Sequence, residues 1–406
     1  MLGFAAGPFN AAYEQRIDFA ALRRKRVERV REEMRRAGLD ALLVWKDENV
    51  RYLTDLRAQQ IAGKSSFLNG ALLLGQGAPI LFCSGGEVDR VRRMMSWIPH
   101  VHPIPIMEDP GLIDAFVRHQ LAPLFRDHGL SRARLGMDAA PLAMVHAIAR
   151  HLPEVELADG DVVMQRARWI KFPEEIAALE EATAIADAVI ATAAAAVREG
   201  IRECEVAGEA LRTLLALGGE YAHVMTPFVD SGERMAPPNR FATDKLIRYG
   251  DVVFIDIGAC WNGYYADVGR TVVCGRPSPE QRRIFTAVYE ALQACIETMR
   301  PGRTNEEAAR AVREAARRHG LEDHLLSLFI GHGIGIGANE PPYIGEPSPG
   351  APVVEFQPGM VFAVEPLIWV EGVRGGGGVR LEEMILITEQ GPHVMSRAPF
   401  DERLLG

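Results

Sequence analysis

Two aspartates lie close together in the stretch VVFIDIGACWNGYYADVGRTVV. Asn262 and Gly263 separate its two apolar runs, and this dipeptide is a strong signal for a two-residue hairpin loop. With that loop, Asp267 becomes the diagonal neighbour of Asp256 on the same face of the hairpin. Buried carboxylates must be paired, protonated or bound to a metal. The alternative is that these aspartates cap turns or pair with Arg270.

Three later segments add groups that could bind a metal. His332 lies in FIGHGIGIG, and Glu365 interrupts the apolar run VFAVEPLIWV. The segment GVRLEEMILIT contributes Glu382 or Glu383, and strand alternation alone does not choose between them. Two aspartates, two glutamates and one histidine suit a pair of divalent ions, with manganese, cobalt, iron and zinc as candidates.

The glycines around His332 need a separate explanation. GHGIGIG has the look of a dinucleotide-binding loop, but that motif requires a helix directly after the glycines. Here ANEPPYIGEPSPG follows, and its prolines and glycines exclude a helix. We therefore expect the loop to let the backbone come close to a metal or a substrate.

Bulk properties limit the class of protein. The 406 residues are sufficient for two domains, and the net charge of −9 argues against nucleic acid as a partner. The five cysteines show no CxxC spacing, which predicts free thiols in a reducing compartment. No signal peptide and no membrane span are expected, so we predict a cytoplasmic protein.

The chain divides into two differently patterned parts. Residues 12–165 alternate strand-like and helical segments, as in a small α/β domain. A long alanine-rich helix begins at Pro173, and further helices are expected at 204–217, 280–299 and 305–319, with strands between them. The prediction is an α+β chain, with domains at 1–170 and 171–406.

Several segments of the second half resemble those of one known family. The stretches are GDVVFIDIGA, YYADVGRTVVCG, GHGIGIGANEPPYIG, QPGMVFAVEP and GVRLEEMILITEQG. They resemble, in order and spacing, the pita-bread metallohydrolases: methionine aminopeptidase, prolidase, aminopeptidase P and creatinase. GLDALLVWKDENVRYLTDL in the first half is similar to the N-terminal domain of prolidase and creatinase. The resemblance implies a pita-bread catalytic domain preceded by a creatinase-type α/β domain.

The resemblance also implies roles for individual residues. Glu365 would act as general base as well as ligand, Glu382 would bridge two ions, and Arg380 would lie at the active site. Two divalent ions would hold the hydroxide that attacks the substrate, and manganese is the metal we expect first. The implied metal ligands are Asp256, Asp267, His332, Glu365 and Glu382.

The sequence departs from the family pattern at two positions where peptidases usually carry substrate-facing histidines. Asn239 and Asn339 stand there, and asparagine can orient a substrate but cannot serve as a useful acid. Arg57 and the segment 58–66 are expected to help select the substrate, because relatives with this N-terminal domain are dimers in which that domain closes over the partner's site. Asp55 stands where the family usually has glycine. The lyase that cleaves dimethylsulfoniopropionate has an aspartate in a similar stretch.

The resulting expectation is a dinuclear metal-dependent hydrolase of an amide or peptide C–N bond, of the Xaa-Pro dipeptidase type. It would act as a homodimer on a dipeptide or small molecule, with no nucleic-acid or membrane partner. One alternative is a lyase or hydrolase of a small zwitterionic metabolite on the same fold. The base of the dimethylsulfoniopropionate lyase would fall on Ala338, so lyase activity is not assigned. A catalytically inactive binding protein is the other alternative.

Overall fold

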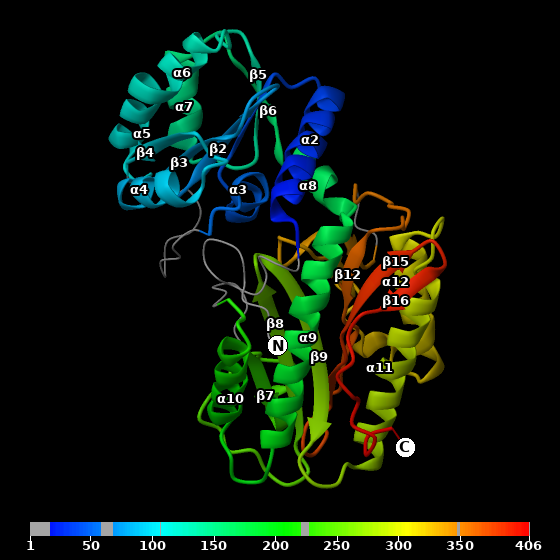
Figure 1. Ribbon diagram of the computed structural model, residues 1–406. Coiled ribbons are helices and arrows are strands. Elements are labelled where there is room, and N and C mark those ends of the chain that lie inside the picture. The colour runs from blue at the N-terminus through cyan, green and yellow to red at the C-terminus, as the bar shows by residue number, and fades with distance from the viewer. Residues whose placement is uncertain (1–16, 58–67, 106, 221–226, 347–349, 406) are drawn as a thin grey trace, which may run out of the picture. The chain divides into compact units, whose positions relative to one another are not determined.

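The computed structural model forms two compact units, which divide after Arg168 (Figure 1). Each unit has its own cluster of buried apolar side chains. The mixture of helices and sheets confirms the predicted α+β class. The structure describes residues 17–57, 68–105, 107–220, 227–346 and 350–405.

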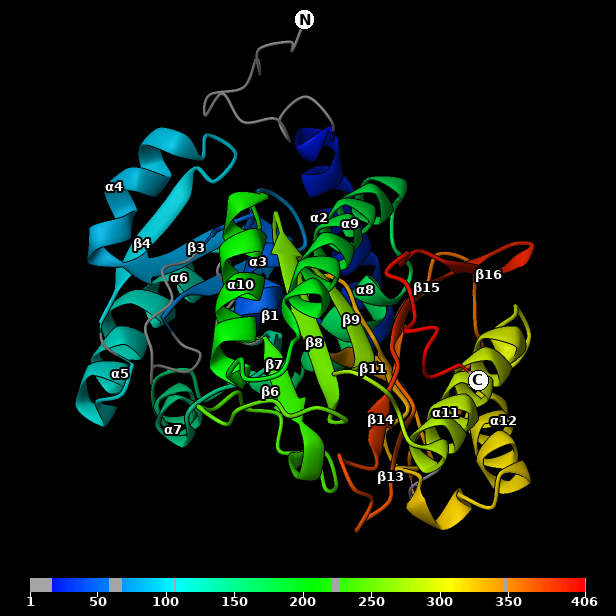
Figure 2. The same ribbon diagram turned by 90° about the horizontal axis from the view of Figure 1, so that it is seen from below.

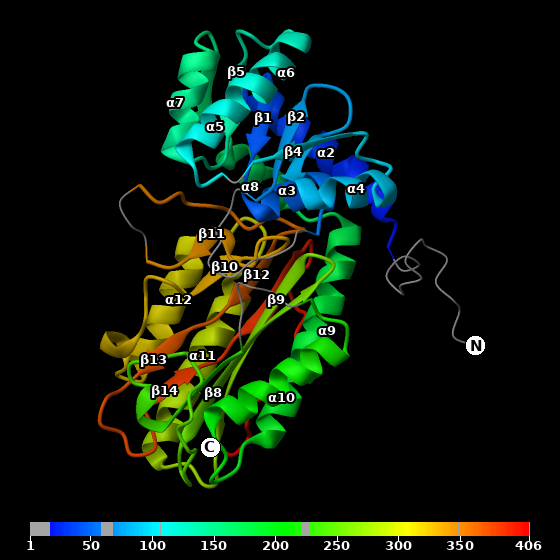
Figure 3. The same cartoon turned by 90° about the vertical axis from the view of Figure 1, so that its left-hand side faces the viewer.

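The N-terminal unit is built on a six-stranded mixed sheet in the order β4-β3-β2-β1-β5-β6 (Figure 3). Its central strand β1 reads ALLV and is buried along its whole length, as expected for a strand covered on both faces. β1 runs parallel to β5 and antiparallel to β2. The strands are β1 (Ala41–Val44), β2 (Gly70–Leu74), β3 (Ile80–Ser84), β4 (His100–Ile104), β5 (Arg134–Met137) and β6 (Glu156–Asp159).

Helices surround this sheet, and their ends follow the local sequence. Asp18 caps the first helix by accepting a hydrogen bond from the Ala21 N–H, and Gly38 ends it with a φ of 65°. Asp55 ends the next helix, also in the left-handed region. The helices are α2 (Phe19–Ala37), α3 (Asp47–Thr54), α4 (Gly85–Met94), α5 (Pro110–Phe116), η1 (Val117–Leu121), α6 (Ala122–Asp127), α7 (Leu142–His151) and α8 (Asp161–Trp169).

The C-terminal unit contains the predicted hairpin of β8 (Val252–Trp261) and β9 (Tyr264–Val273). Asn262 and Gly263 form its loop with positive φ values of 49° and 84°, as a two-residue hairpin turn requires. Asp256 faces Gly269 and Gly258 faces Asp267. The predicted register of the two aspartates is therefore confirmed.

Two further groups of strands complete this unit. β7 (Phe228–Ser231) pairs with the outer side of β8. A five-stranded antiparallel sheet has the order β11-β10-β12-β15-β16, and β13 and β14 form a separate antiparallel pair. These strands are β10 (Gly331–Gly333), β11 (Glu340–Ile344), β12 (Val361–Val364), β13 (Leu367–Trp369), β14 (Gly378–Arg380), β15 (Glu383–Thr388) and β16 (Gly391–Val394).

Two pairs of helices pack on these strands (Figure 2). In the first pair one helix lies along β8 and β9, and the other packs on it and on β7. In the second pair one helix packs against β12, β13 and β14, and the other packs on it and on β11. The predicted helices after Pro173 agree with the observed ones to within one residue at each end. No helix in the described ranges combines the length and apolar character that a membrane span requires. The helices are α9 (Pro173–Ala196), α10 (Glu203–Ala216), α11 (Pro279–Thr298) and α12 (Asn305–Arg318), with short 3₁₀ turns η2 (Gly232–Arg234) and η3 (Glu322–His324).

Candidate metal centre

The fold brings the predicted ligands together in the interior of the C-terminal unit. Asp267, His332 and Glu382 each offer a ligand atom, and these atoms all lie within 4.8 Å of one another. The Glu365 Oε1 atom lies 3.4 Å from His332 Nε2. All four side chains are buried. Residues from β9, β10 and the ends of β12 and β14 thus meet at one point.

Asp256 joins the cluster through the hairpin register. Its carboxyl group contacts that of Asp267, and its Oδ2 atom lies 3.8 Å from Arg380 Nη1. Strand pairing places both aspartates on the same face of the β8–β9 ribbon. The five residues that the resemblance implies as ligands therefore form one group.

Gly269 makes room for this group on the ribbon. A Cβ atom at this position would lie 2.9 Å from the Glu382 Oε2 atom, closer than real Cβ contacts allow. The Gly269 carbonyl also accepts a hydrogen bond of 3.0 Å from the Glu382 N–H. The glycine opposite Asp256 in the hairpin therefore lets the glutamate lie directly against the strand.

The ring of His332 is oriented by its own backbone. Nδ1 lies 2.9 Å from the carbonyl oxygen of Gly333, which can only accept a hydrogen bond, so Nδ1 carries the hydrogen. Nε2 then faces Asp267 at 3.8 Å and Glu365 at 3.4 Å. A histidine fixed in this tautomer presents an Nε2 lone pair, as metal-binding histidines do.

The protein compensates the acidic side chains of the cluster only in part. Burial raises the pKa of Asp256 to about 6 and, together with neighbouring carboxylates, raises the pKa values of Asp267 and Glu382 well above their usual range. Asp256 Oδ1, Asp267 Oδ1 and both carboxylate oxygens of Glu382 are buried without a hydrogen-bond partner in the described residues. Such carboxylates fit divalent cations, which would supply the missing positive charge.

Glu365 and Arg380 differ from the other charged groups here. Arg380 Nη1 lies 2.8 Å from Glu365 Oε2. Burial acts to raise the pKa of Glu365, but the charge of Arg380 and the nearby His332 ring outweigh it and leave that pKa lowered. Glu365 is therefore held in its ionised form.

The choice between the two adjacent glutamates is settled by their partners. Glu383 Oε1 forms an ion pair of 2.9 Å with Arg270, and Ser396 donates a hydrogen bond to its other oxygen. Glu382, in contrast, faces Asp267 and His332. The alternative in which Arg270 neutralises Asp256 or Asp267 is wrong, because its guanidinium is committed to Glu383.

The structure shows which protein group the glycine loop after His332 surrounds, and the expected approach to a metal or substrate stays a prediction. A Cβ at Gly335 would lie 3.0 Å from Glu340 Oε1, and one at Gly337 would lie 2.6 Å from Glu340 Oε2. Lys171 Nζ forms a buried ion pair of 3.2 Å with the same carboxylate. These two glycines therefore let the loop wrap around Glu340, and the stretch that follows is strand β11, not a helix.

A comparison with protein families agrees with this geometry. Residues 177–389, which include every residue of the cluster, match Metallopeptidase family M24. The chain belongs to this family. Residues 26–170 match the Creatinase/Prolidase N-terminal domain, which confirms the resemblance of both halves and the pita-bread fold.

Individual relatives of this M24 protein are dipeptidases by name. The chain is 28% identical to an Xaa-Pro dipeptidase of Pyrococcus horikoshii over 90% of its own length and 95% of that protein. It is 37% identical to the Xaa-Pro dipeptidase of Pyrococcus furiosus, over 57% of this chain and 64%, just under two thirds, of that protein. The solved structure of an Xaa-Pro dipeptidase from Bacillus anthracis superposes with a TM-score of 0.78 at 26% identity, covering 93% of this chain and 99% of the other.

The predicted substrate residues of this M24 protein lie outside the ligand cluster. Asn239 and Asn339 are exposed, and the described hydrogen bonds do not link either side chain to the metal ligands. Arg57 belongs to the N-terminal unit, where Arg90 donates a hydrogen bond to its carbonyl oxygen. The roles given to these three residues stay predictions. The segment 58–66 lies outside the described residues.

Asp55, in the N-terminal unit, has a structural role. Its carboxylate forms ion pairs of 2.9 Å with Arg23 and 2.6 Å with the buried Arg26, both on α2. Its backbone adopts a φ of 59°, a conformation that glycine, asparagine and aspartate tolerate best. The carboxylate is thus engaged in holding α3 to α2.

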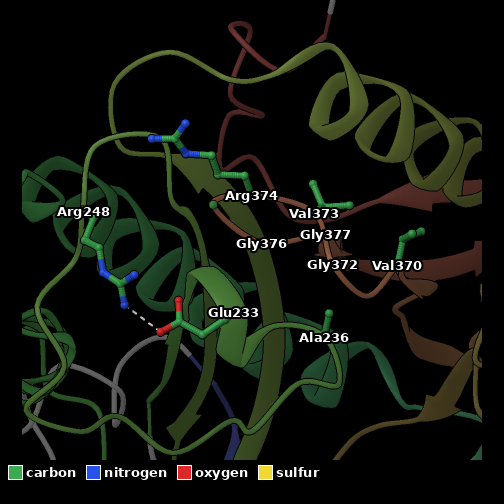
Figure 4. Close-up of a pocket in the computed structure, with 10 residues that line it drawn as sticks. Glu233, Ala236, Arg248, Val370, Gly372, Val373, Arg374, Gly376 and Gly377 are labelled. Atoms are coloured by element: carbon green, nitrogen blue, oxygen red, sulfur yellow. Dashed lines mark hydrogen bonds and ion pairs between the residues drawn. The ribbon is translucent and has the colours of Figure 1, made fainter.

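A separate pocket of about 390 Å³ lies at the connection between β13 and β14 (Figure 4). It is lined by the glycine-rich segment 372–377 and by Glu233 and Arg248, which form an ion pair of 2.6 Å. None of the five predicted metal ligands lines it. This pocket is therefore not the metal centre.

Proposed function

We propose that the protein is a dinuclear metal-dependent dipeptidase that cleaves the C–N bond of Xaa-Pro dipeptides. The observation that carries the proposal is the buried set of four carboxylates and one imidazole, several of whose oxygens have no partner in the described residues. Family membership and the names of the relatives support the same reaction. The catalytic domain would be residues 171–406, with residues 1–170 as the N-terminal domain.

The donor set would hold two divalent ions, and manganese is our first expectation. Bound there, such ions would act as Lewis acids on a carbonyl and lower the pKa of water. Asp256 and Asp267 would approach them from the hairpin, His332 from β10, and Glu382 from between β14 and β15. Both oxygens of Glu382 lack a partner among the described residues, so each would be available to a cation.

Glu365 would accept the proton of the attacking water, since its lowered pKa keeps it ionised and its oxygens lie beside the ligands. Arg380 would stabilise negative charge that develops on the substrate. Its Nε and Nη2 atoms are buried and have no hydrogen-bond partner in the described residues, while Nη1 is held by Glu365. Two donors are therefore left for a substrate oxygen.

Asn239 and Asn339 would orient the substrate without transferring protons. A histidine that donates a proton to a leaving group typically contributes about 10²–10⁴ in rate. We therefore expect slow turnover, and we expect the Asn239→His and Asn339→His double variant to be faster. The same asparagines favour a second candidate, a lyase or hydrolase of a small zwitterionic metabolite at this metal centre.

Three further proposals concern the setting of the reaction. We propose a homodimer, because the N-terminal half matches the creatinase and prolidase type. We propose a cytoplasmic location, because all five cysteines are free and four are buried, as expected in a reducing compartment. The substrate would be a dipeptide, with Arg57 contributing to its selection.

The decisive experiment combines metal analysis with a substrate screen. The purified protein, reconstituted with manganese, is expected to bind two ions per chain and to release proline from Xaa-Pro dipeptides. Glu365→Gln should keep most of the metal and lose turnover. Bound metal with cleavage of betaine-like compounds but not of Xaa-Pro dipeptides would favour the second candidate. Failure to bind any divalent ion would exclude both.

A further inference from the structure

The segment from Asn239 to Phe241 is fixed beside the metal centre by strand β7. The Asp230 carboxylate on that strand is fully buried and accepts hydrogen bonds from the N–H groups of Asn239 at 2.6 Å and Arg240 at 2.8 Å. The Phe241 ring packs edge-on against Phe228, with centroids 6.2 Å apart. The segment therefore lies along β7, in contact with Phe228 and Asp230.

This part of β7 lies next to a metal ligand. Phe228 is paired directly with Asp256 in the antiparallel register, so the two side chains share one face of the sheet. Phe228 and Asp230 are two residues apart and lie on that same face. A segment pinned to both of them is therefore adjacent to the Asp256 side of the cluster.

Arg240 is a cation without a partner in this segment. Its backbone φ is 75°, and its exposed guanidinium has no hydrogen bond or ion pair with any described residue. Arg234, which precedes this segment, is different, because it is paired with Glu203 and Asp230 at 3.3 Å each.

We infer that Arg240 determines substrate specificity by binding the free terminal carboxylate of the peptide, with Phe228 and Phe241 forming an apolar wall beside it. The inference rests on the proposed function, because it names a substrate group for that same site. A guanidinium matches a carboxylate with two parallel hydrogen bonds, which a lysine does not reproduce. A carboxylate bound there restricts the enzyme to short peptides whose C-terminus lies close to the cleaved bond.

The test compares two ligands that differ only at that group, glycyl-proline and glycyl-prolinamide. Their dissociation constants are measured by calorimetry on chelator-treated protein, in which turnover does not interfere. The wild type should bind the free acid about tenfold more tightly than the amide, as expected for a partly solvated hydrogen bond to a charged group. Arg240→Gln should remove this ratio, Arg240→Lys should restore part of it, and added salt should reduce it in the wild type.

Arg282→Gln is the matched control. Arg282 is also exposed and without a partner in the described residues, but it lies on α11. This variant should keep the wild-type ratio. Circular dichroism spectra and melting temperatures of all variants test for misfolding, which is not expected because the Arg240 side chain forms no hydrogen bond or ion pair with a described residue.

Turnover of the manganese-loaded protein separates this inference from the proposed function. If Arg240→Gln loses the preference for the free acid while the wild type cleaves no Xaa-Pro dipeptide, the proposed function is wrong and the role of Arg240 is upheld. If the wild type cleaves dipeptides and Arg240→Gln keeps the preference, the role of Arg240 is wrong. A wild type that binds both ligands equally, or neither, also overturns the inference.

Discussion

Glu382 and Glu383 are neighbours in sequence and both buried, yet they should respond in opposite ways to the same isosteric change. Glu383→Gln removes the charge that neutralises Arg270 at 2.9 Å, where both side chains are nearly inaccessible. Breaking a buried ion pair from one side costs about 3–5 kcal/mol. For a domain of this size that corresponds to a fall in melting temperature of roughly 6–20 °C, at about 2–4 °C per kcal/mol. This loss should be the same with and without metal.

Glu382→Gln should behave differently because its carboxyl group forms no ion pair and accepts no hydrogen bond from the described residues. Its pKa is raised well above the usual range by burial and by neighbouring carboxylates, so removing its negative charge should cost the metal-free protein little. The variant should then be as stable as the metal-free wild type to within about 1 kcal/mol. It should lose the stabilisation by metal, which is about 2.7 kcal/mol when the free ion is at 100 times its Kd.

The assay is thermal unfolding of the wild type and both variants, each in chelator and in excess manganese. The expected pattern is a metal-dependent shift in the wild type and in Glu383→Gln but not in Glu382→Gln. If Glu382→Gln lowers the melting temperature in chelator as much as Glu383→Gln does, the carboxylate of Glu382 has a structural partner and our assignment fails. A metal shift that survives in Glu382→Gln would refute the reasoning equally.

Three more outcomes follow from the structure. Gly269→Ala should weaken metal binding at least tenfold by isothermal titration, because its Cβ would displace the Glu382 carboxylate; Gly200→Ala, at an open turn, is the control for backbone strain alone. Lys171→Met should lower the free energy of unfolding in urea by about 3–5 kcal/mol, and adding Glu340→Gln should recover part of that loss. Equal losses in the single and the double variant would contradict the ion pair. Asp55→Asn should cost about 1–3 kcal/mol in the same assay and leave kcat unchanged, whereas a loss of turnover would point to a catalytic Asp55.

The hairpin part of the site could be predicted from the sequence because it depends on local information. Asn262 and Gly263 determine the turn, the turn determines the register, and the register places Asp256 and Asp267 on one face. No contact distant in sequence is needed for this step. The prediction that two carboxylates meet there was confirmed for that reason.

The assignment of Glu382 could not be reached by periodicity. β14 ends at Arg380 and β15 begins at Glu383, so the two residues between the strands interrupt the alternation on which such an argument depends. Both glutamates are buried, and apolar neighbours do not distinguish them. Only the position of Arg270, a distant residue in sequence, decides which one is neutralised by the protein.

The groups that surround the glycine loop could also not be predicted from the sequence. A glycine shows that space is scarce but not which group occupies it. The groups here are Glu340 and Lys171, which are 169 residues apart in the sequence. Arg240 was not predicted for a related reason. An arginine that follows Asn239 in a loop is expected to be solvated, and the sequence does not show that Asp230 holds its backbone.

The arrangement of the ligands has a mechanical consequence. Asp256 and Asp267 belong to the sheet of β7, β8 and β9, whereas His332 and Glu365 belong to or directly follow strands of the five-stranded sheet. Cations shared by these residues would cross-link two separately hydrogen-bonded layers, much as a disulfide joins two loops. Hydrogen exchange should therefore slow most on the facing strands when the ions bind, and the seam between the layers would be the first place to open when they leave.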